Sequence, residues 1–350
     1  MVTVSLQGGG TEKVVSLLAT HFSQEYLTSI ITLVNVAPFY DLASSVNVLS
    51  PSKRLGRSKF VRTFQQFWHA FKSLREFRPD VCIIFGEEIA GLLCPIARLA
   101  GASRVFVSNR GTPGRSLRGV LRYLNPISYR LAECVIVQTN QASQTLKSTY
   151  RKCRFKVIAN PISIPGSVPM IGSRKKQIIY VASLGRDKNQ IGLIRVFSSL
   201  NSTNDWKLVF VGDGPDRMRL ETLVRQTGME NKIDFLGQRT DVAGLLQESQ
   251  IFAFPSLSEG FPNALAEALA AGCACISYDC LTGPRDLVSD GVNGMLIPVG
   301  NETLFSENLQ TLIDHERLRI AFSEKARSMI RQYEASTIIA KFRQLISPDT

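Results

Sequence analysis

Residues 251–272 read IFAFPSLSEGFPNALAEALAAG, an apolar run followed by a turn and an alanine-rich run. The first four residues are apolar and end at Pro255, which predicts a short buried strand. Residues 263–271 are rich in alanine and leucine and stop at Gly272, which predicts a helix. Gly260 then lies in a tight turn between the two. A strand, a turn and a helix in this order are typical of a parallel sheet covered by helices.

The start of this helix is suited to hold a phosphate. The first amides of a helix, here those of Asn263, Ala264 and Leu265, have no partner within the helix and carry the positive end of its dipole. Glu259 precedes the helix and Glu267 lies inside it, and carboxylates accept hydrogen bonds from vicinal hydroxyls. Two glutamates at this spacing alone are more typical of a solvated helix. The complete run favours a sugar-nucleotide site.

The alternation of short apolar runs and helical stretches continues along all 350 residues, enough for two domains. We expect strands at 2–6, 29–34, 81–85, 104–108, 134–138, 178–181, 207–211, 233–235, 251–254 and 274–278. We expect helices at 12–24, 60–77, 89–99, 117–131 and 141–149, and a final helix at 318–345. This order predicts an α/β fold of two doubly wound, Rossmann-like domains that face one cleft, with ligand at the carboxyl ends of the strands.

A change in composition marks the domain boundary. After Asn160-Pro161 the sequence is enriched in Pro, Gly, Ser and charged residues up to Lys176. We therefore expect an N-terminal domain at 1–163, a linker at 164–176 and a C-terminal domain at 177–335. The end of the last helix, 336–350, is expected to pack back toward the N-terminal domain.

The seven cysteines are an odd number spread along the chain, which does not indicate a disulfide framework. Cys273, Cys275 and Cys280 cluster without a nearby histidine, so we expect buried thiols, no metal and no cofactor. The N-terminus does not read as a secretory signal, and no window approaches 18 uncharged apolar residues. These features predict a cytoplasmic protein.

The net charge of +12 is concentrated in the first half. Residues 1–160 carry 21 Lys plus Arg against 8 Asp plus Glu, hence +13, whereas residues 161–350 carry 20 against 21, hence −1. The densest basic stretches contain Lys53, Arg54, Arg57, Lys59, Arg62, Lys72, Arg75, Arg78, Arg110, Arg115, Arg118, Arg122 and Arg130. Such a surface suits anionic lipid, a phosphorylated acceptor or nucleic acid, and a merely solvated basic surface remains an alternative. Because interleaved aromatic platforms are not evident, we expect no nucleic-acid partner.

Two further strands end in candidate ligand loops. Arg186 and Lys188 follow strand 178–181 and supply two cations that can neutralise a leaving diphosphate. Gly212 and Gly214 follow strand 207–211, where a plain β-to-α turn is an equal explanation.

A glycine loop, Gly8-Gly9-Gly10, follows the first strand and opens a helix. The third glycine of the dinucleotide-binding fingerprint is missing, which disfavours a Rossmann dehydrogenase. The first strand is short, which leaves open a true start upstream of Met1.

The order of these pieces resembles the retaining family-4 glycosyltransferases of the GT-B fold over nearly the whole chain. The most specific parts are residues 237–241, the run 259–267 and the turns at 283–294. By this resemblance, Glu259 contacts the donor sugar, Glu267 the ribose and Lys188 a phosphate, with the amides of 263–265 on the diphosphate. The implied donor site also contains Gly260, Phe261, Gly212, Gly214 and Arg239. The implied acceptor-side loops contain Gly8, Gly9, Gly10, Asn109 and Arg110.

The sequence departs from the family pattern at two places. Ser183 occupies the position of the usual phosphate-binding arginine, for which Arg186 is a candidate substitute from the same loop. In the stretch 107–113, which resembles a Ser-Glu-Arg-Asn-x-Pro motif, Asn109 replaces Glu and Gly111 replaces Asn. The histidines of the first half, His21 and His69, both fall within expected helices, and we do not assign either to catalysis.

The resulting hypothesis is a retaining transferase that moves a hexosyl or N-acetylhexosaminyl unit from a UDP-sugar to a lipid-linked or polysaccharide acceptor. The basic N-terminal domain is expected to hold it at the inner face of the cytoplasmic membrane. Alternatives are a GDP-mannose or ADP/UDP-glucose dependent transferase, and a noncatalytic relative that binds sugar nucleotides or glycans.

Overall fold

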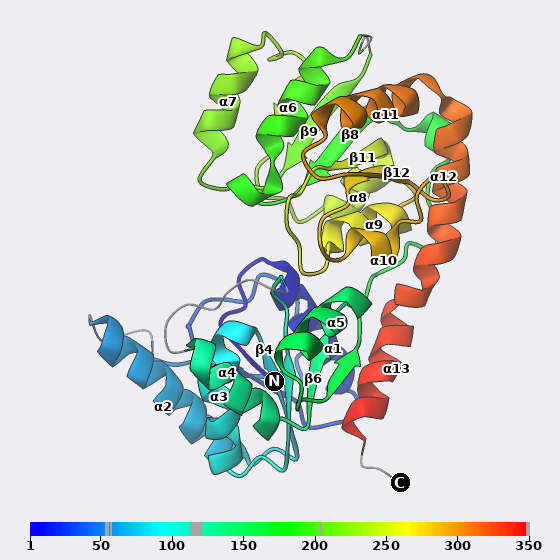
Figure 1. Ribbon diagram of the computed structural model, residues 1–350. Coiled ribbons are helices and arrows are strands. Elements are labelled where there is room, and N and C mark those ends of the chain that lie inside the picture. The colour runs from blue at the N-terminus through cyan, green and yellow to red at the C-terminus, as the bar shows by residue number, and fades with distance from the viewer. Residues whose placement is uncertain (53–55, 57, 113–120, 202, 204, 348–350) are drawn as a thin grey trace. The chain divides into compact units, whose positions relative to one another are not determined.

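The computed structural model describes residues 1–347 apart from 53–55, 57, 113–120, 202 and 204 (Figure 1). The chain divides into an N-terminal unit, Met1–Asn160 with Ile338–Thr350, and a C-terminal unit, Pro161–Thr337. The boundaries expected from composition, at 163 and 335, lie close to these divisions. The basic residues Lys53, Arg54, Arg57, Arg115 and Arg118, and the first residues of the expected helix 117–131, lie outside the described residues.

The N-terminal unit is built on a parallel sheet with strand order β3-β2-β1-β4-β5-β6-β7. Its strands are β1 (Val2–Thr3), β2 (Ser29–Thr32), β3 (Asn47–Leu49), β4 (Val81–Phe85), β5 (Arg104–Ser108), β6 (Cys134–Val137) and β7 (Phe155–Val157). The sheet alternates with helices α1 (Gly10–Phe22), α2 (Lys59–Phe77), α3 (Glu87–Leu99), α4 (Leu121–Leu131) and α5 (Asn140–Thr149). The edge strands β3 and β7 were not predicted, because three residues are too few to show a periodic pattern.

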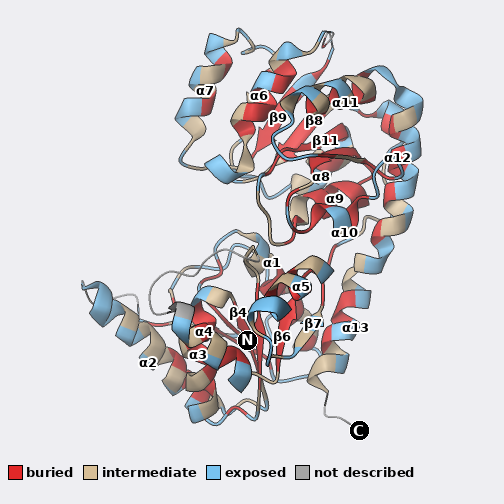
Figure 2. Ribbon diagram, in the orientation of Figure 1, coloured by how far each residue is buried: buried red, intermediate tan, exposed pale blue. Residues whose placement is uncertain are grey.

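The C-terminal unit repeats this plan with a parallel sheet of order β10-β9-β8-β11-β12-β13. Its strands are β8 (Lys175–Val181), β9 (Lys207–Val211), β10 (Ile233–Phe235), β11 (Ser249–Phe254), β12 (Ala274–Tyr278) and β13 (Met295–Ile297). Helices α6 (Gln190–Ser199), α7 (Arg217–Gln226), α8 (Val242–Glu248), α9 (Asn263–Ala270), α10 (Pro284–Leu287), α11 (Glu302–Asp314) and α12 (Glu316–Met329) connect or follow them. The central strands are buried (Figure 2), so the predicted pair of parallel, Rossmann-like halves is confirmed.

The expected linker 164–176 is more ordered than its composition indicated. A 3₁₀ turn, η1 (Ile171–Ser173), is followed directly by β8, which begins at Lys175. The guanidinium of Arg174, only 6% exposed, donates to the carbonyls of Pro169, Ser249 and Gly272. Burial lowers the pKa of Arg174, and these carbonyls stabilise its buried charge. A charged residue therefore lies in the core of the C-terminal unit, in a stretch whose composition predicted a solvent-exposed linker.

The expected final helix 318–345 is wrong as a single element. Helix α12 ends at Met329, a 3₁₀ turn η3 (Ile330–Tyr333) follows, and α13 runs from Ala335 to Ile346. Glu334 has the extended angles φ −54° and ψ 142°, and its backbone pairs with Ile162. Ile162 donates to the Tyr333 carbonyl at 2.8 Å and accepts from the Ala335 amide at 3.0 Å. This pairing satisfies backbone groups that the helix gives up at the break.

Candidate functional site

The predicted strand, turn and helix of residues 251–272 are all present. Helix α9 spans Asn263–Ala270 and directly follows the turn after β11. At its end Gly272 has φ +71°, and the Cys273 and Gly272 amides donate to the carbonyls of Ala268 and Leu269. These are the two hydrogen bonds of a Schellman motif, which explains why the helix stops at a glycine.

The beginning of α9 offers backbone donors. The first hydrogen bond of its ladder runs from the Ala266 amide to the Pro262 carbonyl at 3.1 Å. The Asn263 amide donates to the Phe261 carbonyl at 3.0 Å. The backbone amides of Ala264 and Leu265 have no carbonyl acceptor within the helix. Two amides at the positive end of the helix dipole therefore point away from the ladder. A phosphate or carboxylate is the group such a terminus favours.

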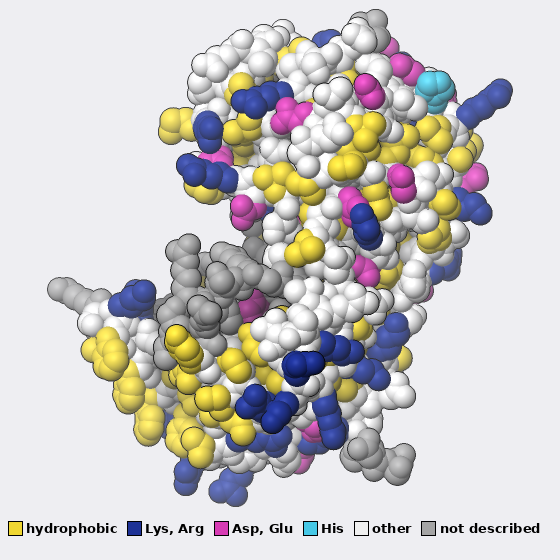
Figure 3. All heavy atoms as spheres, viewed as in Figure 1, with side chains coloured by type: hydrophobic (Ala, Val, Ile, Leu, Met, Phe, Trp, Pro, Cys, Tyr) yellow, Lys and Arg dark blue, Asp and Glu magenta, His cyan; other side chains and the backbone are white. Residues whose placement is uncertain are grey.

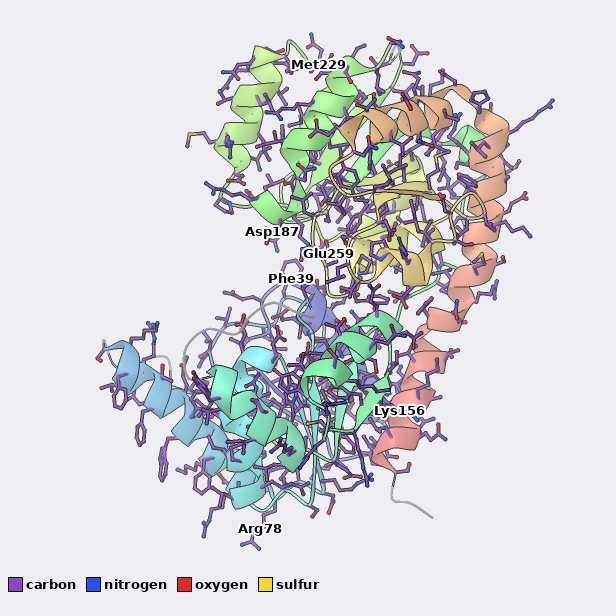
Figure 4. The ribbon with its side chains drawn as sticks, viewed as in Figure 1. Phe39, Arg78, Lys156, Asp187, Met229 and Glu259 are labelled. Atoms are coloured by element: carbon purple, nitrogen blue, oxygen red, sulfur yellow. The ribbon has the colours of Figure 1, made fainter. Side chains whose placement is uncertain are left out.

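Lys188 and Glu259 form a close ion pair beside this helix. Lys188 Nζ lies 2.6 Å from Glu259 Oε1, and the two side chains are 26% and 11% exposed. Lys188 ends the short 3₁₀ turn η2 (Arg186–Lys188) after β8, whereas Glu259 lies in the loop after β11. Because β8 and β11 are neighbours in the parallel sheet, these loops meet at its carboxyl edge (Figure 4). Sequence reasoning assigned both residues to the site, and the fold brings them into contact.

Three further bonds hold the two loops together. The Leu257 amide donates to the Asp187 carbonyl at 2.9 Å. The buried hydroxyl of Tyr180 donates to the Lys188 carbonyl at 2.9 Å and lies 2.8 Å from Ser256 Oγ. Burial, and then the Glu259 carboxylate, raise the pKa of Tyr180 well above its usual value, so the phenol stays protonated as a donor. Sequence reasoning did not identify Tyr180 or Ser256, because their role depends on strand neighbours.

The loop after β12 also holds Glu259 in place. The buried hydroxyl of Thr282 donates to the Glu259 carbonyl. Gly283 has φ +101°, and a Cβ there would meet Pro262 Cδ at 2.3 Å. A glycine is therefore required for the loop to pack against the start of α9. Burial is the main cause that raises the pKa of the neighbouring Cys280 to about 12, so this thiol stays neutral beside the carboxylate. Cys273, Cys275 and Cys280 are buried free thiols, as predicted.

The glycines after β9 support the same edge of the sheet. Gly212 has φ +133°, and a Cβ there would lie 2.0 Å from the Ala182 carbonyl oxygen. A Cβ on Gly214 would lie 2.3 Å from the Leu184 carbonyl oxygen. The two glycines thus let the turn pack on the loop that carries Arg186 and Lys188. This packing is the structural role that the sequence left open for Gly212 and Gly214.

The remaining donor-side candidates differ in placement. Arg186 and Ser183 are exposed on the loop of Lys188, and Glu267 is half-buried on α9. Phe261 is 6% exposed and packs against Tyr333 with a ring distance of 6.1 Å, while Gly260 is half-buried beside it. Arg239 forms an exposed two-bond ion pair with Asp241, at 2.8 Å and 2.6 Å. A donor contact of Arg239 stays a prediction.

Two of the predicted acceptor-side residues, Asn109 and Arg110, directly follow the carboxyl end of β5. Asn109 is buried and donates to the Tyr129 hydroxyl at 2.9 Å. Arg110 donates to Asn160 and stacks over the Phe85 ring at 5.1 Å. Burial lowers the pKa of the Arg110 guanidinium to about 9. Asn109 therefore has an internal structural role, and Arg110 is a weakly solvated cation at the sheet edge.

The N-terminal glycine loop ends at helix α1, which begins at Gly10. Gly9 has φ −174°, an extended conformation that any residue adopts, and Gly8 precedes it. A Cβ on Gly9 would meet only the carboxylate end of Glu12, at 2.4 Å.

His21 and His69 lie within α1 and α2, as expected, and His69 Nε2 is 3.3 Å from the Leu49 carbonyl.

A cavity of about 460 Å³ lies at the opposite end of the N-terminal sheet. It is lined by Phe22, Leu74, Phe77 and Cys82, near the amino ends of β1 and β4. The candidate residues lie at the carboxyl ends, so this cavity is not part of their site. Within the described ranges, no three His, Cys, Asp or Glu side chains form a metal-ion cluster, and no helix is long and apolar enough to cross a membrane.

Comparison with known proteins gives matches over the C-terminal unit and over the whole chain. The model of the family described as glycosyl transferases group 1 matches residues 168–329. The lipopolysaccharide 1,6-galactosyltransferase of Salmonella typhimurium is 31% identical over 75% of this chain and 72% of its own length. The GalNAc-alpha-(1->4)-GalNAc-alpha-(1->3)-diNAcBac-PP-undecaprenol alpha-1,4-N-acetyl-D-galactosaminyltransferase of Campylobacter jejuni is 25% identical over 99% of this chain and 97% of its own. Anabaena HepE, solved in complex with UDP, superposes with a TM-score of 0.78 at 17% identity, covering 99% of this chain and 98% of its own.

Proposed function

This chain belongs to the group 1 glycosyl transferases, and we propose that it moves a hexosyl or N-acetylhexosaminyl unit from a UDP-sugar to a hydroxyl of a lipid-linked or polysaccharide acceptor. The reaction proceeds with retention at the anomeric carbon, as in family 4 of the GT-B enzymes. The observation that carries this proposal is the Lys188–Glu259 ion pair, 2.6 Å long, beside the start of α9. It combines a cation, a carboxylate and free helix amides at one sheet edge.

Each part of this arrangement has a role in the proposed transfer. The amides of Ala264 and Leu265 hold the diphosphate, and Lys188 neutralises the charge that develops as it leaves. Arg186, exposed on the same loop, supplies a second cation in place of the arginine missing at Ser183. Glu259 accepts hydrogen bonds from the transferred sugar, and Glu267 from the ribose.

The proton of the acceptor hydroxyl passes to an oxygen of the leaving phosphate. The amides and cations then stabilise the diphosphate that carries it, since these groups are aimed at the site before the reaction begins. We propose that the reaction requires no metal and no cofactor besides the sugar nucleotide.

UDP is favoured as the donor nucleotide because HepE, of the same fold over nearly its whole length, has been solved with UDP. A GDP-mannose or ADP/UDP-glucose donor is the alternative in the same class. For the acceptor, the Campylobacter relative is named for an undecaprenol-linked glycan and the Salmonella relative for lipopolysaccharide. A lipid-linked acceptor places the enzyme at the cytoplasmic face of the membrane, where the N-terminal excess of +13 meets anionic lipid.

Replacement of Glu259 tests the catalytic assignment. Glu259→Gln keeps the size of the side chain but removes the charge that holds Lys188, so we expect transfer to fall by roughly 100-fold or more. Glu248→Gln is a matched control, because Glu248 forms a Lys–Glu pair of the same 2.6 Å length with Lys175 in an exposed position. Near-normal transfer by Glu259→Gln is incompatible with the assignment. Donor binding without turnover in the wild-type protein supports the noncatalytic alternative instead.

A further inference from the structure

Helix α2 carries a row of aromatic side chains that the N-terminal unit leaves in solvent. Phe60, Phe64 and Trp68 are 81%, 61% and 56% exposed. Their i, i+4, i+8 spacing places them on one face of the helix. Single exposed apolar side chains are ordinary, whereas a contiguous apolar patch marks an interaction surface.

The row is ordered by its own contacts. The Phe64 and Trp68 rings stack with centroids 6.3 Å apart, and Trp68 contacts the half-buried Phe71 at 5.6 Å. The fully buried residues of α2 lie in its second half, among them Ala70 and Leu74, and the half-buried Phe67 also packs against the core. All residues from 59 to 69 are exposed or half-buried (Figure 2). The rings of Phe60 and Phe64, in the first half of α2, therefore remain exposed to solvent.

A second exposed apolar row lies on α4. Tyr123, Ile127 and Leu131 are 72%, 55% and 42% exposed and also follow an i, i+4, i+8 pattern. Helix α3 packs against both α2 and α4, which joins the two rows into one region of the N-terminal unit. Hydrophobic side chains gather over these helices in the space-filling view (Figure 3). We call this region, the exposed apolar residues of α2 and α4, the aromatic face.

The charges within α2 and α4 are almost all positive. Glu76 is the one acidic residue within α2, and α4 contains none. The exposed basic residues of these helices are Lys59, Arg62, Lys72, Arg75 and Arg130. Protein interfaces are depleted in lysine, and two copies of this face would bring like charges together. Aromatic side chains with flanking Lys and Arg are instead the composition of a helix that lies in a membrane interface.

We propose that the aromatic face inserts into the interface of an anionic bilayer, with α2 parallel to the membrane surface. Phe60, Phe64 and Trp68 enter the boundary between headgroups and acyl chains, while the flanking cations contact lipid phosphates. At 19 residues α2 covers about 28 Å of membrane surface. Membrane insertion would bring the enzyme to a lipid-linked acceptor, so this proposal rests on the proposed function.

Vesicle binding by the full chain tests the proposal directly. We expect co-sedimentation with vesicles of phosphatidylglycerol and phosphatidylcholine that is stronger than with phosphatidylcholine alone and weakens as salt rises. The double variant Phe60→Gln/Phe64→Gln is expected to bind roughly tenfold more weakly, since it removes two inserted rings. Glutamine favours a helix at least as well as phenylalanine, so the fold is retained. Met218→Gln, at a residue 78% exposed on α7, is the matched control that leaves binding unchanged.

Trp68 supplies a second readout. The chain has two tryptophans, and the other, Trp206, is 5% exposed beneath the Arg319 guanidinium. We expect a blue shift of tryptophan fluorescence with anionic vesicles and quenching by lipids brominated near the headgroup. Equal binding by the double variant overturns the proposal, as does unchanged fluorescence. Self-association of the protein through the aromatic residues would also overturn the proposal. So would RNA that displaces the protein from vesicles and itself quenches the fluorescence of Trp68.

The two proposals fail separately. Glu259→Gln is expected to bind vesicles as the wild type does, whereas Phe60→Gln/Phe64→Gln is expected to keep the thermal shift with UDP. Vesicle binding without any glycosyl transfer therefore contradicts the proposed function alone. Transfer to a lipid-linked acceptor that is unaffected by the double variant contradicts the docking surface alone.

Discussion

The Lys188–Glu259 pair joins two kinds of side chain that a sugar-nucleotide site needs, a cation for the diphosphate and an acceptor for the hydroxyl protons of the sugar. Their contact joins residues that are 71 positions apart in the chain. It depends on β8 and β11 being neighbours, and on Tyr180 and Thr282 holding the two loops.

Removal of Lys188 is expected to weaken donor binding. UDP at 100 times its dissociation constant stabilises the wild-type protein by about 2.7 kcal/mol. The hydrogen bond from a charged lysine to phosphate contributes about 1.5–3 kcal/mol, so Lys188→Ala raises the dissociation constant roughly 10- to 100-fold. At the same UDP concentration the stabilisation then falls to about 0.4–1.4 kcal/mol. Thermal unfolding with and without UDP measures this difference.

Lys175→Ala is the control for that measurement. Lys175 pairs with Glu248 at the same 2.6 Å, but its side chain is 65% exposed and lies at the amino end of β8. We expect the full UDP effect to remain in this variant. A full UDP effect in Lys188→Ala would remove Lys188 from the donor site.

At the scale of elements, the turn after β9 has a stringent requirement for glycine. Gly212→Ala places a Cβ 2.0 Å from a backbone oxygen at φ +133°. We expect it to destabilise the fold by about 1–3 kcal/mol from the backbone angle, with a further cost for moving residues 182–184. Gly244→Ala, in an exposed turn of α8 with no atom within 4 Å of its Cβ, should stabilise by about 0.5–1 kcal/mol. Urea unfolding compares the two, and equal stabilities would contradict the packing described here.

The elements that the sequence did not reveal have physical reasons in common. The break between α12 and α13 coincides with the pairing of Glu334 with the distant Ile162. It contains neither Gly nor Pro, so no local signal in the sequence marks it. The residues before β8 were predicted to be a linker because they include charged side chains such as Arg174. The carbonyls that accept hydrogen bonds from Arg174 lie up to 98 residues away in the chain, so its burial could not be predicted. By contrast, the stretch 251–272 was predicted closely, since its apolar strand and its glycine stop are local signals.

At the scale of the molecule, the division of charge corresponds to a division of candidate roles. The N-terminal half carries +13, the arginine at the end of β5 and the aromatic face of α2 and α4. The C-terminal half carries −1 and holds the paired Lys188 and Glu259 with the start of α9. The sequence predicted the basic half, but the aromatic face became evident only from the exposure of its side chains.

The most direct test of the central claim is a transfer assay with labelled sugar nucleotides and a bacterial membrane extract as acceptor. We expect label from a UDP-hexose or a UDP-N-acetylhexosamine to enter the lipid fraction or a polysaccharide with the wild-type enzyme and with Glu248→Gln. The label should be lost with Glu259→Gln. Incorporation only from GDP- or ADP-sugars would contradict the donor assignment. Undiminished incorporation by Glu259→Gln would contradict the site itself.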